Sequence, residues 1–375
     1  DWKEVMKDPE KLDPEIRAHI ESENAYFESF ESTFHKTTKD VESELIARMD
    51  PEDSQVPMKD GDWEYWSEYR NGGNYPVFRR RNINENSDNH GEVSTLFDGD
   101  KEAEGFDHFD LSGLVRSPDD RYLAYALDTK GSEYYEIRIR DLETGKDLPD
   151  VIKDSSGNMV WSKAGDKLYY IEMDDNHRPR DVKVHELGSD PENDPVLYTE
   201  DDPVYFLGLG QSFSEEYIFI SISAQETDEC RILPSDAPAG TKPTLFRARE
   251  EGVEYSLEHH GNHFYIHTNK DGATEFKVMR TPVDAPADEN WQEIIPHDPD
   301  VTIMGIATYK NHMVRMQREN ALPEIVVSDY DGESEWRVEF PDPVYAIGMN
   351  EGYEFDGHTL RVNYMTPAKP LTVYD

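Results

Sequence analysis

The sequence has a single cysteine, few basic residues and no long apolar run. Cys230 has no second cysteine with which to form an internal disulfide, which suits a reducing cytoplasm, although periplasmic proteins without disulfides also exist. No apolar stretch approaches the ~20 residues of a membrane span, and the N-terminus lacks a basic segment followed by an apolar one. We therefore expect a cytoplasmic protein without a membrane partner, and the periplasm stays open.

Positive charge is scarce. Lys and Arg together number 38 against 81 Asp and Glu, so the net charge is -43. Such a chain repels phosphate backbones and anionic lipid head groups, which excludes nucleic acid as an expected partner. The acidity favours either a highly soluble, salt-adapted surface or the attraction of cationic ligands, and charge alone does not choose between them.

Aromatic residues are plentiful, with 6 Trp, 21 Tyr and 15 Phe, which is too many for a disordered chain. The first 50 or so residues have a helical pattern: Asp13 is a candidate N-cap before Pro14, and apolar residues recur at Ile16, Ile20 and Phe27. A second helix is expected over residues 41–49. We predict an N-terminal helical segment over residues 1–55.

From about residue 60 the sequence becomes a series of short β-branched and aromatic runs separated by turn residues. The runs repeat: Gly113–Tyr125, Asn158–Tyr170 and Leu207–Ile220 each read as an apolar strand, a polar turn and a second apolar strand. Looser copies begin at Tyr255, Met304 and Ala346, so the repeats lie 42–49 residues apart. That period is typical of a four-stranded propeller blade.

These six copies, with a degenerate earlier one over residues 63–97, predict an all-β fold. The expected architecture over residues 56–375 is a seven-bladed β-propeller with four-stranded blades, preceded by the short N-terminal α-helical segment. The last copy is one strand short, since only residues 371–374 follow its second strand. An unpaired sheet edge is a liability, so we expect the polypeptide to continue beyond Asp375.

The chain offers little chemistry. It has no Gly-x-Ser-x-Gly nucleophile motif, because the nearest string, residues 210–214, lacks the closing Gly and reads as an inner strand. It has no phosphate-binding loop, and four histidines (His259, His260, His263 and His267) lack the further ligands of a zinc site. No catalytic, cofactor-binding or metal-binding residue is predicted.

Turns between second and third strands are expected to gather on one face of the propeller. The richest in charged side chains is the segment 172–180, whose members are Glu172, Asp174, Asp175, Arg178 and Arg180. These five residues are our candidates for an interdomain or substrate-facing loop, with a solvated hairpin tip as the alternative.

Several segments resemble the oligopeptidase B group of the prolyl oligopeptidase family in their order and spacing. They are residues 20–26 (IESENAY), 174–179 (DDNHRP), 227–233 (TDECRIL) and 249–255 (REEGVEY), together with 364–367 (YMTP) and 372–375 (TVYD) near the end. The resemblance covers essentially the whole chain. It implies a helical segment and a propeller that precede an α/β-hydrolase domain, which would begin after Asp375 and would carry the Ser, Asp and His of a serine peptidase.

The resemblance further implies that this chain is non-catalytic and acts as a lid that admits short peptides to the hydrolase domain. The expected parent enzyme is a serine endopeptidase that cleaves after Lys or Arg, without a cofactor, and basic peptides are its expected substrates. Two alternatives stay open. One is a propeller of a peptidase specific for proline or acylated N-termini, and the other is a stand-alone propeller scaffold for protein interactions.

Overall fold

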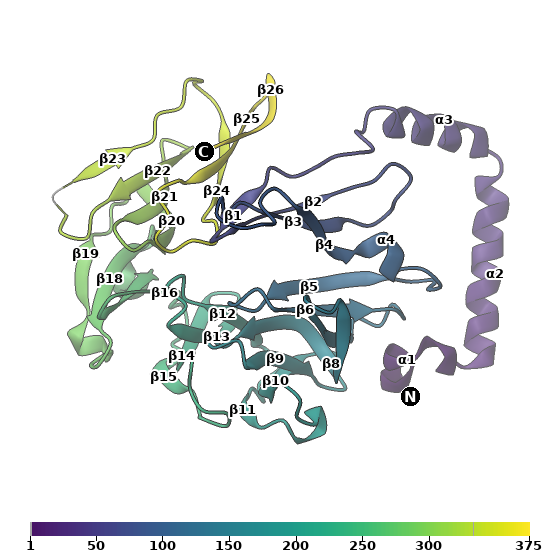
Figure 1. Ribbon diagram of the computed structural model, residues 1–375, viewed down its shortest axis with the longest axis horizontal. Helices are drawn as coiled ribbons and strands as arrows, with labels where there is room; N and C mark the ends of the chain where they lie inside the picture. Colours follow the sequence, from purple (N-terminus) through teal and green to yellow (C-terminus); the bar gives the residue numbers. More distant parts are fainter. Residues whose placement is uncertain (1, 333) are drawn as a thin grey trace.

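The computed structural model describes residues 2–332 and 334–375. Antiparallel sheets are arranged in a ring, and a helical arm leaves the ring at the N-terminal end (Figure 1). The helices and 3-10 turns of the described residues are α1 (Trp2–Lys7), η1 (Pro9–Lys11), α2 (Pro14–Glu31), α3 (His35–Ile46), α4 (Gly99–Glu102), η2 (Pro191–Asn193), η3 (Lys270–Gly272) and η4 (Asp288–Asn290). None of the described helices is long and apolar enough to cross a membrane.

The helical arm confirms the N-cap that the sequence predicted. The Asp13 carboxylate accepts a hydrogen bond from the backbone N–H of Glu15 at 2.8 Å, and Pro14 occupies the first helical position of α2. No described residue of α1, α2 or α3 is buried, so the apolar side chains of the arm face solvent. The arm therefore has an apolar surface that the rest of the described chain does not cover.

The strands pair in sequence order within each sheet. The first sheet contains β1 (Met58–Asp60), β2 (Trp63–Glu68), β3 (Val77–Asn82) and β4 (Val93–Asp98). A seven-stranded sheet contains β5 (Asp110–Arg116), β6 (Tyr122–Asp128), β7 (Tyr135–Asp141), β8 (Lys146–Trp161), β9 (Lys167–Met173), β10 (Pro179–Glu186) and β11 (Val196–Thr199).

The remaining sheets follow around the ring. They contain β12 (Phe206–Gln211), β13 (Tyr217–Ala224), β14 (Thr227–Pro234) and β15 (Thr244–Arg247); then β16 (Tyr255–His260), β17 (His263–Thr268), β18 (Lys277–Pro282) and β19 (Gln292–Ile295); then β20 (Val301–Thr308), β21 (Met313–Glu319), β22 (Leu322–Ser328) and β23 (Glu335–Arg337); and last β24 (Ala346–Asn350), β25 (Arg361–Thr366) and β26 (Lys369–Tyr374). The last sheet has three strands, in agreement with the short final repeat.

The prediction of seven four-stranded blades is wrong. The described strands form six hydrogen-bonded sheets, of which four have four strands, one has seven and one has three. The difference arises at β8, which pairs with β7 through its first half and with β9 through its second, and Ser155 faces both partners. The turn-forming residues there bend the strand, with positive φ at Asp154 and Gly157, and shift its register with β9 between Ser155 and Met159, yet β8 continues as one strand.

Apolar clusters fill the junctions between neighbouring sheets. One cluster joins β9 and β10 to β12 and β13, another joins β13 and β14 to β16 and β17, and others join the first sheet to β5 and β6 and the last sheet to β20–β22. Among the described residues, none of the six apolar clusters joins the first sheet to the last. We call this junction, between β1–β4 and β24–β26, the seam.

Candidate functional site

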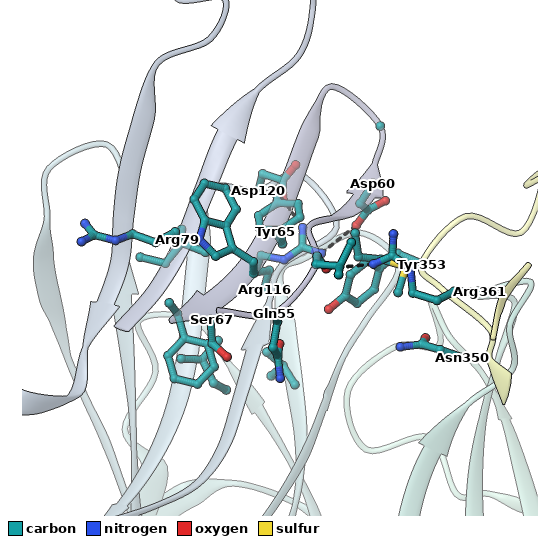
Figure 2. A pocket seen from close by; sticks show the side chains of 18 of the residues that line it. Gln55, Asp60, Tyr65, Ser67, Arg79, Arg116, Asp120, Asn350, Tyr353 and Arg361 are labelled. Carbon is teal, nitrogen blue, oxygen red and sulfur yellow. Dashed lines mark hydrogen bonds and ion pairs between the residues drawn. The ribbon is translucent and has the colours of Figure 1, made fainter. Parts of the chain in front are cut away.

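A cavity of about 920 Å³ opens beside the seam (Figure 2). Its walls come from the ends of inner strands β1, β5, β8, β12 and β24, so residues far apart in the sequence meet there. Met159, Val160 and Trp161 supply an apolar wall, and Gln211 and Glu215 lie near the end of β12. The cavity therefore lies among four of the six described sheets and belongs to no single one.

Arg116 is the central charged side chain of the cavity. It ends β5, and the turn that follows brings Asp120 back beside it, 2.6 Å from the guanidinium. A second carboxylate, Asp60 at the end of β1, lies 2.7 Å from Nη2. Burial alone would lower the pKa of Arg116, but the neighbouring Tyr65, Asp60 and Asp120 raise it, so the side chain stays charged.

Two tyrosines enclose the same guanidinium. Arg116 Cζ lies 3.5 Å from the ring centroid of Tyr65 on β2 and 5.1 Å from that of Tyr353 in the β24–β25 loop (Figure 2). The Tyr65 hydroxyl donates to Asp120 at 2.8 Å, and the two rings meet edge to face with centroids 6.2 Å apart. Arg116 therefore ties together the first sheet, the seven-stranded sheet and the last sheet by ion pairs and cation–π contacts.

The rest of the seam is also polar. Lys59 lies 2.7 Å from Glu354, and the backbone N–H of Gly61 donates to the same carboxylate at 3.2 Å. Arg361 on β25 donates to the Val56 carbonyl at 2.8 Å and forms a paired contact with Asp375 at 2.6 and 2.7 Å. Charged and polar groups hold the first and last sheets together where other junctions use apolar side chains.

The cavity walls carry both acidic and basic side chains. Burial and the nearby Asp60 carboxylate raise the pKa of Glu215, which lies in the same cavity. The cavity lining combines four acidic side chains (Asp53, Asp60, Asp120 and Glu215) with three arginines (Arg79, Arg116 and Arg361), so its charges are nearly balanced. Among the described residues, the cavity lining contains serines but no histidine that could act as their base.

The sequence-predicted loop lies elsewhere, at the β9–β10 hairpin beside α1. Asp175 lies 2.9 Å from Lys7 of α1, and Asp174 accepts hydrogen bonds from the backbone of the same turn. Arg180 lies 2.9 Å from Asp201, whereas Glu172 lies 2.7 Å from Lys183. The Arg178 guanidinium lies 3.6 Å from the ring centroid of Phe206 and donates to the Pro203 carbonyl. The structure gathers all five candidates in one hairpin, and their interdomain role stays a prediction.

The histidines singled out by the sequence have structural partners. His259 Nδ1 lies 2.7 Å from the Ser214 hydroxyl, while His260 Nε2 and His267 Nε2 each lie 2.8 Å from a backbone carbonyl, of Lys310 and Ile303 respectively. Burial lowers the pKa of His267, as it does for His259 and His263. In the part of the chain that the structure describes, no three His, Cys, Asp or Glu side chains are grouped to hold a metal ion.

Sequence reasoning missed Arg116, Asp60, Tyr65 and Tyr353. Arg116 stands in a recognised repeat, but its partners come from the opposite ends of the chain and meet only when the ring closes. Because none of these residues belongs to a motif with fixed spacing, no local pattern marks them. The only available signal was the repeat architecture, which brings the first and last copies together.

Comparison with known proteins assigns the fold to a family. Residues 3–375 match the family described as the N-terminal β-propeller domain of prolyl oligopeptidase. Dipeptidyl aminopeptidase BI of Pseudoxanthomonas mexicana is 31% identical over 99% of this chain and 52% of its own length, and protease 2 of Moraxella lacunata is 26% identical over 96% of this chain and 52% of its own length.

Solved structures give the same result. Oligopeptidase B from Trypanosoma brucei, in a closed form with covalently bound antipain, superposes with a TM-score of 0.88 at 26% identity, covering 98% of this chain and 53% of that one. Oligopeptidase B from Leishmania major has the same fold, with a TM-score of 0.89 at 24% identity over 99% of this chain and 53% of that one. The chain spans about half the length of the relatives that it matches. The chain belongs to the prolyl oligopeptidase family and matches that family's N-terminal β-propeller domain.

Proposed function

We propose that this chain is the substrate-gating, non-catalytic part of an oligopeptidase B-like serine endopeptidase that hydrolyses short peptides after Lys or Arg. The observation that carries the proposal is the family match over the whole chain, combined with relatives that are about twice as long. The partner is then an α/β-hydrolase domain in the same polypeptide, which would supply the nucleophile, base and oxyanion hole.

The helical arm supports an interdomain surface. Exposed apolar side chains follow one another along α2 and α3, and the arm is fixed to the ring at its start by Lys7, which contacts both Asp154 and Asp175. The exposed apolar residues of the arm include Ile16, Ile20, Phe27, Phe30, Phe34 and Leu45. A run of this kind marks an interaction site. We propose that the hydrolase domain covers this arm and the adjacent 172–180 hairpin.

The seam supports the gating role. A ring whose first and last sheets meet through ion pairs opens at that junction more readily than at an apolar one, since exposed ion pairs contribute little and are screened by salt. The cavity lies beside this junction, so its opening would widen the path of a peptide.

A second specificity is favoured by one relative. The protein at 31% identity bears the name dipeptidyl aminopeptidase, an activity that removes two residues from a free N-terminus. Cleavage after proline and cleavage of acylated N-termini remain further alternatives within the family. Each of these specificities would depend on the hydrolase domain, and the gating role of the propeller is common to them.

Hydrolysis by the full-length polypeptide tests the proposal. Four chromogenic substrates are compared: an N-blocked peptide ending in Arg, an unblocked dipeptide, an N-blocked peptide ending in Pro, and an acylated amino acid. We expect the blocked Arg substrate to be cleaved fastest, and residues 1–375 alone to cleave none. Preference for the unblocked dipeptide would replace the endopeptidase assignment with a dipeptidyl aminopeptidase. Cleavage by residues 1–375 alone would overturn the non-catalytic role.

A further inference from the structure

The loop between β24 and β25 is unusually long for an inner hairpin of this ring. It comprises residues 351–360, and we call it the mouth loop. The other turns that join an inner strand to the next strand have two to five residues, as at 61–62, 117–121, 162–166, 212–216, 261–262 and 309–312. A hairpin needs no more than that to reverse direction, so the extra residues of the mouth loop serve some other purpose.

One half of the mouth loop reaches across the seam. Tyr353 lies against Tyr65 and Arg116, and Glu354 lies 2.7 Å from Lys59. Glycines flank residues 353–356, with Gly352 at φ 78° and Gly357 so close to the Glu354 carbonyl that a Cβ would lie 2.8 Å from it. The stretch that carries the contacts of both halves is therefore bounded by two backbone positions that favour glycine.

The other half reaches the remaining sheets. The Phe355 ring lies 6.0 Å from Phe213 of the β12–β13 turn and 6.2 Å from His260 at the end of β16. The backbone N–H of Lys310 donates to the Phe355 carbonyl at 2.9 Å, and the Lys310 ammonium lies 2.7 Å from Asp356. This half is held by a backbone hydrogen bond as well as by an ion pair.

The ten residues of the mouth loop contact each of the other five described sheets. The loop must therefore cross one end of the ring. From the last sheet, the mouth loop contacts β1 and β2, β5, the β12–β13 turn, β16 and the β20–β21 turn. The cavity lies on the Tyr353 side of the loop, because its lining includes Tyr353 but no residue of β16 or β20 (Figure 2). The loop thus fills one side of the opening and leaves the other side free.

We propose that the mouth loop is a gate that sets the size of the opening at this end of the ring. It is latched by Tyr353 on Arg116 and Tyr65 and by Glu354 on Lys59 and the Gly61 N–H, and it opens by releasing these contacts while Phe355 and Asp356 remain attached to the β20–β21 turn. The inference that peptides pass this gate rests on the proposed function. The closure itself rests only on the contacts above.

The latch is a weak attachment, and the Lys310–Asp356 pair of the other half is no more buried, with side chains 56% and 58% exposed. The other half differs by the backbone hydrogen bond from Lys310 to the Phe355 carbonyl. The Lys59 and Glu354 side chains are 56% and 32% exposed, and a pair this exposed contributes little. The Tyr353 side chain is 51% exposed overall, so the cation–π contact is also only partly desolvated. Loss of both contacts would free the Tyr353 half of the loop without breaking any strand pairing.

A thiol beneath the loop reports on the gate without any enzyme assay. Gln211 at the end of β12 is a suitable position, because it lines the cavity on the Tyr353 side of the loop. The variant Gln211→Cys is made in the full-length protein with Cys230→Ala, so that this chain carries one thiol. Labelling rates are measured with a small maleimide and with a maleimide attached to a hexapeptide.

We expect Tyr353→Ala with Glu354→Ala to raise the labelling rate with the peptide reagent roughly tenfold, since the two lost contacts together amount to about one tenfold step in the gate equilibrium. The rate with the small reagent should change much less. Tyr353→Phe keeps a ring over Arg116 and should label as slowly as the parent. Tyr26→Ala with Glu21→Ala removes the same residue types from α2 and serves as the matched control.

Equal peptide-reagent rates in the parent and the double variant would overturn the gate. If the double variant fails to fold, as judged by circular dichroism, the same comparison is made with Tyr353→Ala alone, and equal rates there are equally decisive. If the labelling rates change as expected but the full-length protein cleaves no peptide, the gate is supported and the proposed peptidase function is rejected. Failure of the gate and failure of the peptidase function are therefore distinguishable.

Discussion

The junction between β9–β10 and β12–β13 and the seam both join neighbouring sheets, yet they use opposite chemistry. At the junction between β9–β10 and β12–β13, the packed apolar side chains are each at most 1% exposed; they include Val182, Val184, Ile218, Ile220 and Ile222. At the seam, the Lys59 ammonium faces the Glu354 carboxylate and the Arg361 guanidinium donates to the Val56 carbonyl, beside a cavity. The stabilisation from apolar burial grows with the apolar area removed from water, whereas exposed ion pairs contribute little and are screened by salt. The comparison teaches that the ring is firmly built along most of its circumference and weakly closed at one place.

The largest expected effect on stability comes from a buried ion cluster within the seven-stranded sheet, whose charges are far less exposed than those of the seam. His185 is 0% exposed, with Nδ1 3.0 Å from Asp194 and Nε2 3.2 Å from Asp150. We expect His185→Ala to lower the free energy of unfolding by about 3–5 kcal/mol, because it leaves two buried carboxylates without their shared partner. Urea denaturation near pH 6 measures the loss.

The same cluster has a predictable pH dependence. Burial alone would lower the pKa of His185, but Asp194 and Asp150 raise it above its usual value. A raised pKa means that the folded state binds the proton more tightly, so the stabilisation is complete below the unfolded pKa of about 6.5 and is lost as pH rises through the folded pKa. A difference between parent and variant that stays constant up to about pH 9 would contradict a charged His185.

Removing apolar area at the firm junction should have the next largest effect. Ile220 on β13 is 1% exposed, and Ile220→Ala is expected to cost about 2–4 kcal/mol through lost burial and the cavity that remains. Leu371 on β26 is 60% exposed and lines the cavity at the seam, so Leu371→Ala is the matched control, with an expected change within about 0.5 kcal/mol. Comparable losses in the two variants, measured by denaturant unfolding, would erase the distinction between the junctions.

Glu258 links the interior of the ring to the mouth loop, and it titrates in an unusual range. Desolvation, with a contribution from Glu351, raises the pKa of Glu258 to about 8. Because the folded state holds this proton more tightly than the unfolded state, stability is fully present below the unfolded pKa of about 4.5 and falls as pH rises through 8.

The variant Glu258→Gln removes that titration. We expect it to match the parent near pH 5 and to exceed it by roughly 2 kcal/mol near pH 9, less than full burial would give because the side chain is only partly covered. Thermal unfolding across this pH range makes the measurement. Parallel pH profiles for parent and variant would show that Glu258 is ionised throughout and that the loop does not shield it.

The sequence predicted the parts of this fold that repeat or that depend on near neighbours. The Asp13 N-cap follows from four adjacent residues, and the strand pairs that begin near Gly113, Asn158 and Leu207 follow from apolar alternation. The sheet count failed because a turn-like string at residues 154–158 bends β8 without ending it, and composition does not distinguish a bend from a break.

The candidate cavity was out of reach for a different reason. Asp60, Arg116 and Tyr353 come from three distant parts of the chain, and their contacts depend on the closed ring. A periodic pattern predicts that repeats exist. It does not predict which side chains of the first and last repeats come into contact when the ring closes. The 172–180 hairpin, by contrast, was visible from its charge, and its partners Lys7 and Asp201 were not.

The substitution with the smallest expected effect on stability is also the one that acts most specifically on the seam. Lys59→Met removes the ion pair with Glu354, at a cost of at most about 1 kcal/mol that should disappear in about 1 M salt. Lys39→Met on α3 removes a similarly exposed pair with Glu42 and is the control. Amide hydrogen exchange separates them, because opening at the seam should speed exchange in β1 and in β24–β26 while leaving β12–β15 protected, and only for Lys59→Met. Uniform acceleration around the ring would mean that the seam is no weaker than the apolar junctions.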